Sequence, residues 1–176
     1  MTGVARYLPP LALALVLAGC NGGSSSGAGT TNSPFVGSYK GSSAITVSTA
    51  AGSKTLRETI WVYLNPDGLV QVGDGESTIY ASGYLHGNTV RIEDDAATVV
   101  DPSCSGTVAL AGTFATAGGG AAFTGQWSSR GASCFGITGT VSGPVTATRV
   151  ATYARATRVF QTNSSTLLRA FREAAK

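Results

Sequence analysis

The stretch Val108–Arg130, VALAGTFATAGGGAAFTGQWSSR, decides the fold. Its large apolar side chains recur at even spacing, and small or polar residues stand between them. Alternation with a period of two is typical of a β-strand that has one face in a core and one in water. Gly118–Gly120 interrupts the pattern with residues that tolerate tight turns. The stretch therefore predicts an antiparallel hairpin.

The same period continues on both sides, from Phe35 to Arg149, and turn signals interrupt it repeatedly. The strongest are Asn65-Pro66-Asp67-Gly68, where Pro sets the first φ and Gly accepts a positive one, and the two-residue turn Gly87-Asn88. We expect these turns to pair Val62 with Val72, Leu64 with Val70, Leu85 with Val90 and Gly83 with Ile92. The pattern predicts an all-β fold, an antiparallel meander of about eight strands that closes into a small barrel.

Glycine precedes a large inward residue by two positions in several of these strands, and such glycines let a sheet bend tightly. The pairs are Gly37/Tyr39, Gly83/Leu85, Gly112/Phe114, Gly125/Trp127 and Gly139/Val141. Gly37-Ser38-Tyr39 at the start and Arg149 at the end resemble the calycins, barrels that begin with Gly-x-Trp and end with a basic residue packed across that Trp. This resemblance implies a calycin-like barrel in which Arg149 packs across Tyr39.

Three cysteines are present. Cys104 and Cys134 lie at equal distances from the glycine turn, which places them at the open end of one hairpin. We expect a disulfide between them, as in other proteins of oxidising compartments. The pairing of Phe114 with Phe123 requires an odd sum of residue numbers, whereas the two cysteines sum to an even number. A bulge, or the loop Gly131-Ala132-Ser133, must therefore absorb one residue.

The apolar run Leu8–Gly19 follows Arg6 and is too short to span a bilayer core, so it is typical of a secretory signal. Its end, Leu17-Ala18-Gly19-Cys20, resembles the lipobox of bacterial lipoproteins. The resemblance implies cleavage before Cys20 and lipidation of Cys20, which would anchor the protein to a membrane. Asn21, rather than Asp, follows the cysteine, and the sorting rule of that family then favours the outer membrane. The alternative is an ordinary signal peptide in which Cys20 has no special role.

These features divide the chain into four parts. Residues 1–19 form the signal peptide, and residues 20–33 form a flexible Gly/Ser tether without charge or bulky apolar side chains. Residues 34–149 form the barrel domain, with net charge −2, and residues 150–176 form a basic tail with net charge +4. Spacing in the tail predicts a short amphipathic C-terminal helix from about Ser165 to Ala175, with Leu167, Leu168 and Phe171 on one side.

Composition excludes several classes of function. Only 12% of the residues are charged, and the cations form no broad patch, which argues against nucleic-acid binding. His86 is the only histidine and lies at an expected hairpin end, where we interpret it as a solvated turn residue. Glu93, Asp94, Asp95 and Asp101 lack the spacing of a calcium loop and are interpreted as solvated charges. We therefore predict a protein that is not an enzyme and has no catalytic residues, metal or cofactor.

Glu58 is expected to point into the barrel, because it alternates with Leu56, Ile60 and Val62. A buried carboxylate needs a partner, and Arg149 is the candidate for a barrel-closing ion pair.

The same alternation points Trp61 and Tyr63 outward, and the Gly87-Asn88 turn sends Tyr80 and Tyr84 outward. Four large aromatic side chains on one outer face would form an apolar patch of the kind that binds a partner. The C-terminal helix either docks on this patch or stays free to lie on anionic lipid.

We therefore expect a lipid-anchored binding module of the bacterial cell envelope. Its ligand would be an envelope or extracellular partner protein, or a small apolar ligand in the lumen. The alternative is a structural envelope lipoprotein with no specific ligand.

Overall fold

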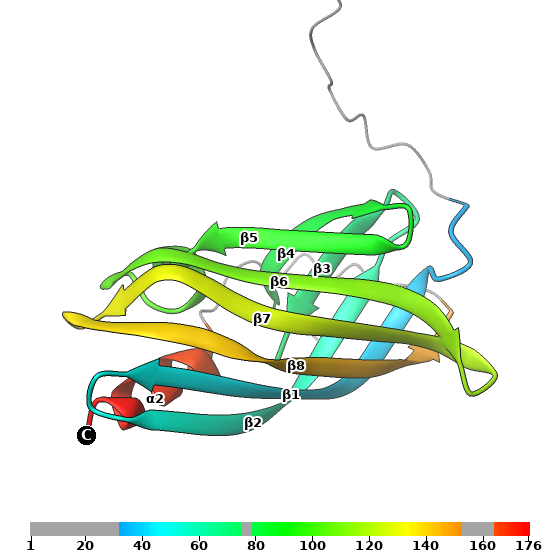
Figure 1. Cartoon of the computed structure of the whole chain (residues 1–176). Helices are drawn as coiled ribbons and strands as arrows, with labels where there is room; N and C mark the ends of the chain where they lie inside the picture. Colours follow the sequence, from blue (N-terminus) through cyan, green and yellow to red (C-terminus); the bar gives the residue numbers. More distant parts are fainter. Residues whose placement is uncertain (1–31, 75–78, 153–163) are drawn as a thin grey trace, which may run out of the picture.

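The computed structural model describes residues 32–74, 79–152 and 164–176. Eight antiparallel strands follow one another around a closed barrel, in which β1 pairs with both β2 and β8 (Figure 1). The predicted all-β barrel with a short C-terminal helix is therefore confirmed. The strands are β1 (Gly37–Thr49), β2 (Ser53–Leu64), β3 (Leu69–Gly73), β4 (Ile79–His86), β5 (Thr89–Asp95), β6 (Cys104–Ala117), β7 (Gly120–Cys134) and β8 (Ile137–Ala151). The helices are α1 (Ala96–Val99), which the sequence pattern did not predict, and α2 (Ser165–Ala174).

The turns set most of the strand register as predicted. In the β2–β3 turn, the amide of Gly68 donates to the carbonyl of Asn65 at 3.0 Å, and Gly68 has a φ of 83°. Val62 pairs with Val72 and Leu64 with Val70, as expected. Between β4 and β5, Leu85 pairs with Val90, but the ladder ends after two pairs and does not reach the predicted pair of Gly83 and Ile92.

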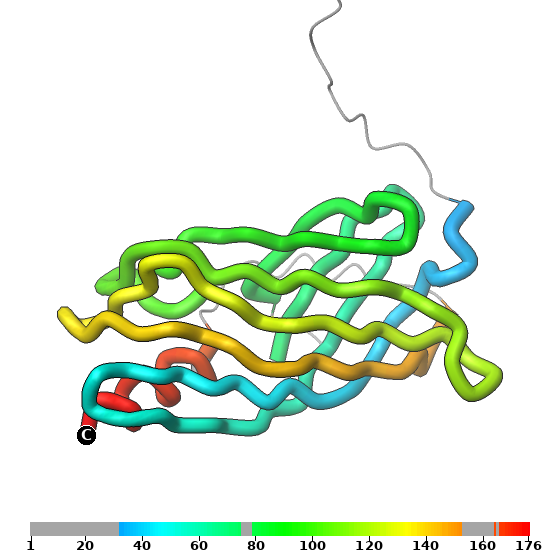
Figure 2. Tube along the Cα trace, viewed as in Figure 1, coloured from blue at the N-terminus to red at the C-terminus, as the bar shows by residue number. Residues whose placement is uncertain are grey.

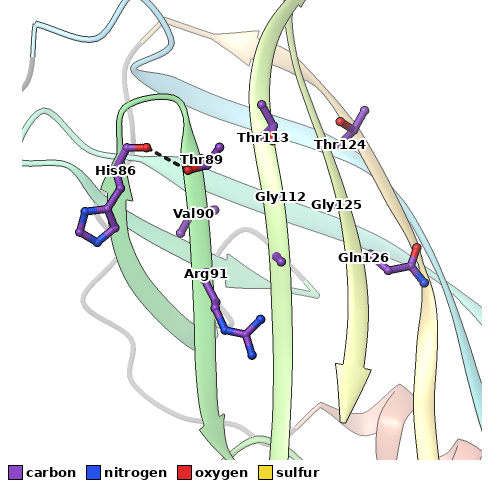
Figure 3. Close-up of a pocket in the computed structure, with 10 residues that line it drawn as sticks. His86, Thr89, Val90, Arg91, Gly112, Thr113, Thr124, Gly125 and Gln126 are labelled. Atoms are coloured by element: carbon purple, nitrogen blue, oxygen red, sulfur yellow. Dashed lines mark hydrogen bonds between the residues drawn. The ribbon is translucent and has the colours of Figure 1, made fainter.

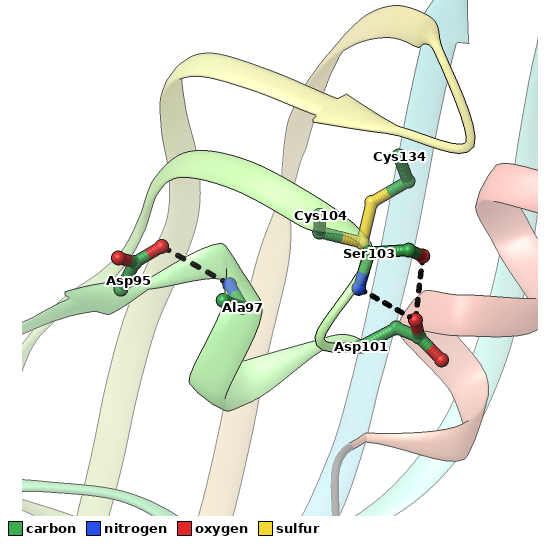
Figure 4. Close-up of a disulfide and its surroundings, with 6 residues drawn as sticks. All are labelled: Asp95, Ala97, Asp101, Ser103, Cys104 and Cys134. Carbon is green, nitrogen blue, oxygen red and sulfur yellow. Dashed lines mark hydrogen bonds between the residues drawn. A yellow bond between two sulfur atoms is a disulfide. The ribbon is translucent and has the colours of Figure 1, made fainter.

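The predicted disulfide joins Cys104 and Cys134, which pair directly at the open end of the β6–β7 hairpin (Figure 4). The expected extra residue is present as well. Ser105 pairs with Ser133 and Thr107 with Arg130, so the segment Gly131-Ala132 bulges opposite the single residue Gly106. Gly106 and Gly131 both have positive φ, which allows the chain to bend at this point without steric strain.

Large aromatic side chains fill the barrel interior. Tyr39, Phe114, Phe123 and Trp127 are at most 1% exposed, and all belong to one hydrophobic core. Phe114 packs between the rings of Tyr39 and Phe123, with centroid distances of 5.2 and 4.9 Å. The indole nitrogen of Trp127 donates to the hydroxyl of Ser43 at 2.9 Å, so the polar atom of this buried ring is satisfied.

Different segments close the two ends of the barrel, which lie on opposite sides of the molecule (Figure 2). At one end, Phe35 stacks on Phe114, and the hydroxyl of Tyr39 donates to the carbonyl of Phe35. At the other end, α2 packs against β1 and β2 and contributes Leu167 and Phe171 to the core. The C-terminal helix is therefore docked at the barrel end, so neither predicted place for it, the aromatic patch or a lipid surface, is correct.

Candidate functional site

The outer wall of the barrel carries many hydroxyl groups, because Ser and Thr are frequent at the outward positions of its strands, above all on β1 and β8. Strand pairing aligns several of them in one row that crosses six strands. Thr113 of β6 pairs with Thr89 of β5 and Thr124 of β7. The row continues through Thr146, Ser42 and Thr59. Each hydroxyl can donate and accept a hydrogen bond, so this wall can make many neutral polar contacts.

A hollow of about 570 Å³ lies on this wall over β5, β6 and β7 (Figure 3). Arg91 pairs with Ala111, and Ala111 pairs with Gln126, so a single methyl group stands between two long side chains. The outer wall is therefore low at Ala111 and higher on both sides. Lining residues also include His86, Thr89, Gly112, Thr113, Thr124 and Gly125.

A second hollow, of about 300 Å³, lies over β7, β8 and β1 and shares Thr124 with the first. Its lining includes Lys40, Ser42, Thr146 and Thr148. We call these two hollows and the threonines between them the outer face. Its cations are already engaged, because Arg91 bonds Glu93 at 2.7 Å and the ammonium group of Lys40 lies 5.2 Å from the Trp61 ring centroid. Glu93 thus balances the charge of Arg91, while Lys40 keeps its charge beside the ring, so the outer face carries little net charge and suits a polar partner better than a strongly charged one.

The predicted aromatic patch is not formed, because Tyr80 points into the barrel. The register of β3 with β4 shifts between Val72 and Gly73, and this bulge reverses the alternation at the start of β4. Tyr80 is only 3% exposed, lies 6.3 Å from the Trp127 ring, and donates a hydrogen bond to Glu58. The prediction that Tyr80 faces outward is therefore wrong.

The other three residues of that patch differ in exposure. Trp61 is partly exposed and stacks on Tyr63 at 6.0 Å between centroids, with only 7° between the ring planes. Tyr63 is just 2% exposed, so it offers almost no surface to a partner. Tyr84 is 47% exposed on β4, where it pairs with Leu69. Trp61 and Tyr84 thus remain as separate aromatic side chains rather than as one patch.

The predicted ion pair between Glu58 and Arg149 is also wrong. Arg149 donates to the carbonyl of Pro34 at 2.8 Å and lies beside Tyr39, with which it pairs across β1 and β8. The resemblance to calycins implied this contact of Arg149 with Tyr39. Burial raises the pKa of Tyr39, and the positive charge of Arg149 opposes that rise.

The acidic residues after β5 have local structural roles. Asp95 caps α1 by accepting from the amide of Ala97 at 3.1 Å, and Asp101 accepts from the amide of Ser103 at 2.9 Å (Figure 4). The hydrogen bond from the Ser103 hydroxyl, followed by that from its amide, lowers the pKa of Asp101. Asp94 is partly buried, which raises its pKa, while a backbone hydrogen bond from Ser82 opposes the rise.

Within the described ranges, no group of three or more His, Cys, Asp or Glu side chains is placed to hold a metal ion. Neither helix of the described chain is long and apolar enough to span a bilayer. The lipobox Leu17-Ala18-Gly19-Cys20 and most of the tether lie outside the described residues, as do residues 153–163 of the basic tail.

The outer face was not predicted from the sequence, although a signal for it was present. Polar alternation marks Thr124 and Gln126 as outward, but outward polar residues are typical of any strand face in contact with water. The short outward side chain of Ala111 between Arg91 and Gln126 was recognisable only after the pairing of three strands was known.

No family model matches the chain, and no curated protein or solved structure matches it either.

Proposed function

We propose that this protein is a lipid-anchored module of the bacterial cell envelope that binds a partner protein through the outer face of its barrel. The anchor would be Cys20, and the tether of residues 20–33 would join it to β1. What supports the anchor is the lipobox-like sequence at residues 17–20. The disulfide between Cys104 and Cys134 agrees with an oxidising compartment outside the cytoplasm.

One observation favours binding on the outside. The interior is filled by Tyr39, Phe114, Phe123 and Trp127, and the two ends are covered by Phe35 and α2. A small apolar ligand needs a cavity lined by such side chains, whereas here the rings pack against one another. The two hollows of the outer face therefore support a surface partner over a ligand in the lumen.

A partner would contact hydroxyl groups and peptide backbone over this surface. Thr124 is common to both hollows, so its replacement by a long cation tests both at once. We expect Thr124→Lys to abolish capture of the partner when the anchored protein is cross-linked in intact envelopes. Thr140→Lys is the matched control, because Thr140 is also an exposed strand threonine but lines neither hollow. Equal capture by both variants would contradict binding at the outer face.

A structural role without a specific ligand is the second candidate. In the described part of the chain, the exposed large hydrophobic residues are Tyr84 on β4, Phe135 in the β7–β8 turn and Val150 on β8, which come from three separate segments. Strong protein interfaces usually contain a cluster of such side chains. If cross-linking in intact envelopes captures no partner above the level of an unrelated lipid-anchored barrel, the structural role is favoured.

A further inference from the structure

Glu58 occupies an unusual position for a carboxylate, between the barrel interior and α2. It pairs with Ser43 across β1 and β2 and faces inward with Ile60 and Val62. Its Oε1 accepts a long hydrogen bond of 3.4 Å from the hydroxyl of Tyr80. Its Oε2 is buried and makes no hydrogen bond of good geometry within the described chain. A buried oxygen of this kind is costly when the group is ionised.

The helix that covers Glu58 is held by a mixture of apolar and polar contacts. Leu167, Ala170, Phe171 and Ala174 are buried against the barrel. The hydroxyl of Thr49 donates to the carbonyl of Ala174 at 2.8 Å, and Lys54 forms a 3.0 Å ion pair with Glu173. At the start of the helix, the amide of Ser164 donates to the carbonyl of Val99 at 2.7 Å. These contacts place α2 over the open end of the barrel, with Thr166 beside the carboxyl group of Glu58.

The surroundings of Glu58 favour its neutral form, chiefly through burial. Burial is the largest cause and raises the pKa of Glu58 to about 7, and the like charge of Asp74 adds to the rise. Thr166, Tyr80 and Arg169 act in the opposite direction. The facing groups thus come from the end of β3, from β4 and from α2, and the neighbour on β1 is the uncharged Ser43.

We propose that Glu58 is a pH-dependent latch, which holds α2 on the barrel end while its carboxyl group is protonated and loosens the helix when it ionises. This device goes beyond the proposed function, because it concerns the closure of the barrel and not the outer face. When α2 leaves, Glu58 becomes solvated and recovers an ordinary carboxyl pKa. Release is therefore favoured by deprotonation.

The direction of the pH dependence follows from the pKa of Glu58 with α2 closed and with α2 open. Its pKa is higher in the closed state, at about 7, than the usual value of 4.5. Protonated Glu58 therefore stabilises the closed state fully when the pH is below its usual pKa, and this stabilisation is lost as the pH rises through 7. Opening of α2 would expose Leu167 and Phe171, so the protein would present a new apolar surface at neutral to alkaline pH.

Hydrogen exchange of the α2 amides in the full, detergent-solubilised chain tests the latch. After correction for intrinsic exchange, we expect protection of α2 to fall on the order of 50-fold between about pH 5 and about pH 8, whereas the β6 and β7 amides change much less. In Glu58→Gln, which is neutral at every pH, protection of α2 should be the same at both pH values. A full pH response in Glu58→Gln would overturn the proposal, and so would an unchanged protection of α2 in the wild type.

Two further variants keep the proposal testable if Glu58→Gln folds poorly. Asp74→Asn removes the like charge that raises the pKa of Glu58, so it should shrink the pH response of α2 and move it to lower pH. Glu173→Gln is the matched control, because it neutralises an acid on the same helix that faces solvent and pairs with Lys54 and Arg169. It should weaken docking similarly at both pH values. A pH response that vanishes in Glu173→Gln and persists unchanged in Asp74→Asn would overturn the latch.

Discussion

The ring of Phe123 occupies the space in which a side chain of Gly112 would lie. A Cβ atom at position 112 would be 2.2 Å from Cζ of Phe123, which is far inside van der Waals contact. Gly112 pairs with Gly125 across β6 and β7, so neither strand places a side chain there. This glycine pair is what lets Phe123 turn into the core and pack on Phe114.

We expect Gly112→Ala to reduce the free energy of unfolding by about 1–3 kcal/mol, because the added methyl group forces the Phe123 ring out of its place. Urea denaturation under non-reducing conditions measures the change. Gly120→Ala is the control, since a Cβ at that position meets no atom within 4 Å. An equal loss in the two variants would contradict the role of the Phe123 ring.

The buried hydrogen bond of Trp127 gives a second prediction. Ser43→Ala leaves the indole N–H of Trp127 without its partner in the core, so the free energy of unfolding should fall by about 1–3 kcal/mol. Ser42→Ala changes the exposed neighbour and should have little effect. The Trp127 environment is followed by near-ultraviolet circular dichroism during denaturation. If Ser42→Ala is as destabilising as Ser43→Ala, the hydrogen bond is not the cause.

The disulfide gives a third prediction. Cys104 and Cys134 are 30 residues apart. In the chain-entropy model, a disulfide that closes a loop of this length stabilises the folded state by roughly 3–4 kcal/mol, because it restricts the unfolded chain. The double variant Cys104→Ala/Cys134→Ala should lose about that amount, and adding a reductant to the variant should have no further effect. Non-reduced peptide mapping by mass spectrometry should show the bridge in the wild type. Free thiols at both positions would contradict it.

The docking of α2 gives a fourth prediction. Phe171 is 1% exposed, and Gly139 lies close to its ring. Phe171→Ala should therefore cost about 3–5 kcal/mol of stability, because it leaves a cavity at the barrel end. Arg172→Ala removes the exposed neighbour, whose guanidinium lies over Phe135, and should cost far less. A thermal denaturation series at one pH distinguishes the two, and equal midpoints would mean that α2 does not stabilise the barrel.

The anchor gives a fifth prediction. Cys20→Ala should leave the protein unprocessed or release it from membranes, because the acylated sulfur is lost. Asn21→Asp keeps the cysteine, so that variant should remain acylated and move toward the inner membrane. Membrane fractionation combined with intact mass measures both. Mature wild-type protein that fractionates with membranes but carries no acyl mass would refute lipidation of Cys20.

Much of the barrel could be predicted from local patterns. Alternation in residues 108–130 marked the inward rings, and the turn at residues 65–68 set the register of β2 with β3. The parity argument on Cys104 and Cys134 located the bulge near Gly131. These predictions succeeded because strand periodicity and turn geometry depend on neighbouring residues.

The candidate site was harder to predict, because it depends on strands that are distant in sequence. The prediction of four outward aromatic residues was wrong at Tyr80, because a bulge opposite Val72 and Gly73 turns the start of β4 inward, whereas Tyr84 stays outward. The predicted ion pair of Glu58 with Arg149 was wrong for a related reason. Alternation placed Glu58 inside, but the approach of Tyr80 and α2 decided its surroundings.

The sequence by itself determined the strand pattern, the disulfide, the amphipathic helix and the lipobox-like N-terminal segment. The disulfide depends on the pair Cys104 and Cys134, and each of the other features depends on residues that are close together in the sequence. Only the tertiary structure decided what covers the barrel ends, which neighbours surround Glu58, and where the outer face is hollowed. The physical reason is that closing the barrel brings β1 against β8 and seats α2 beside β1 and β2. Contacts of this kind depend on how the closed sheet curves, and no local spacing encodes that curvature.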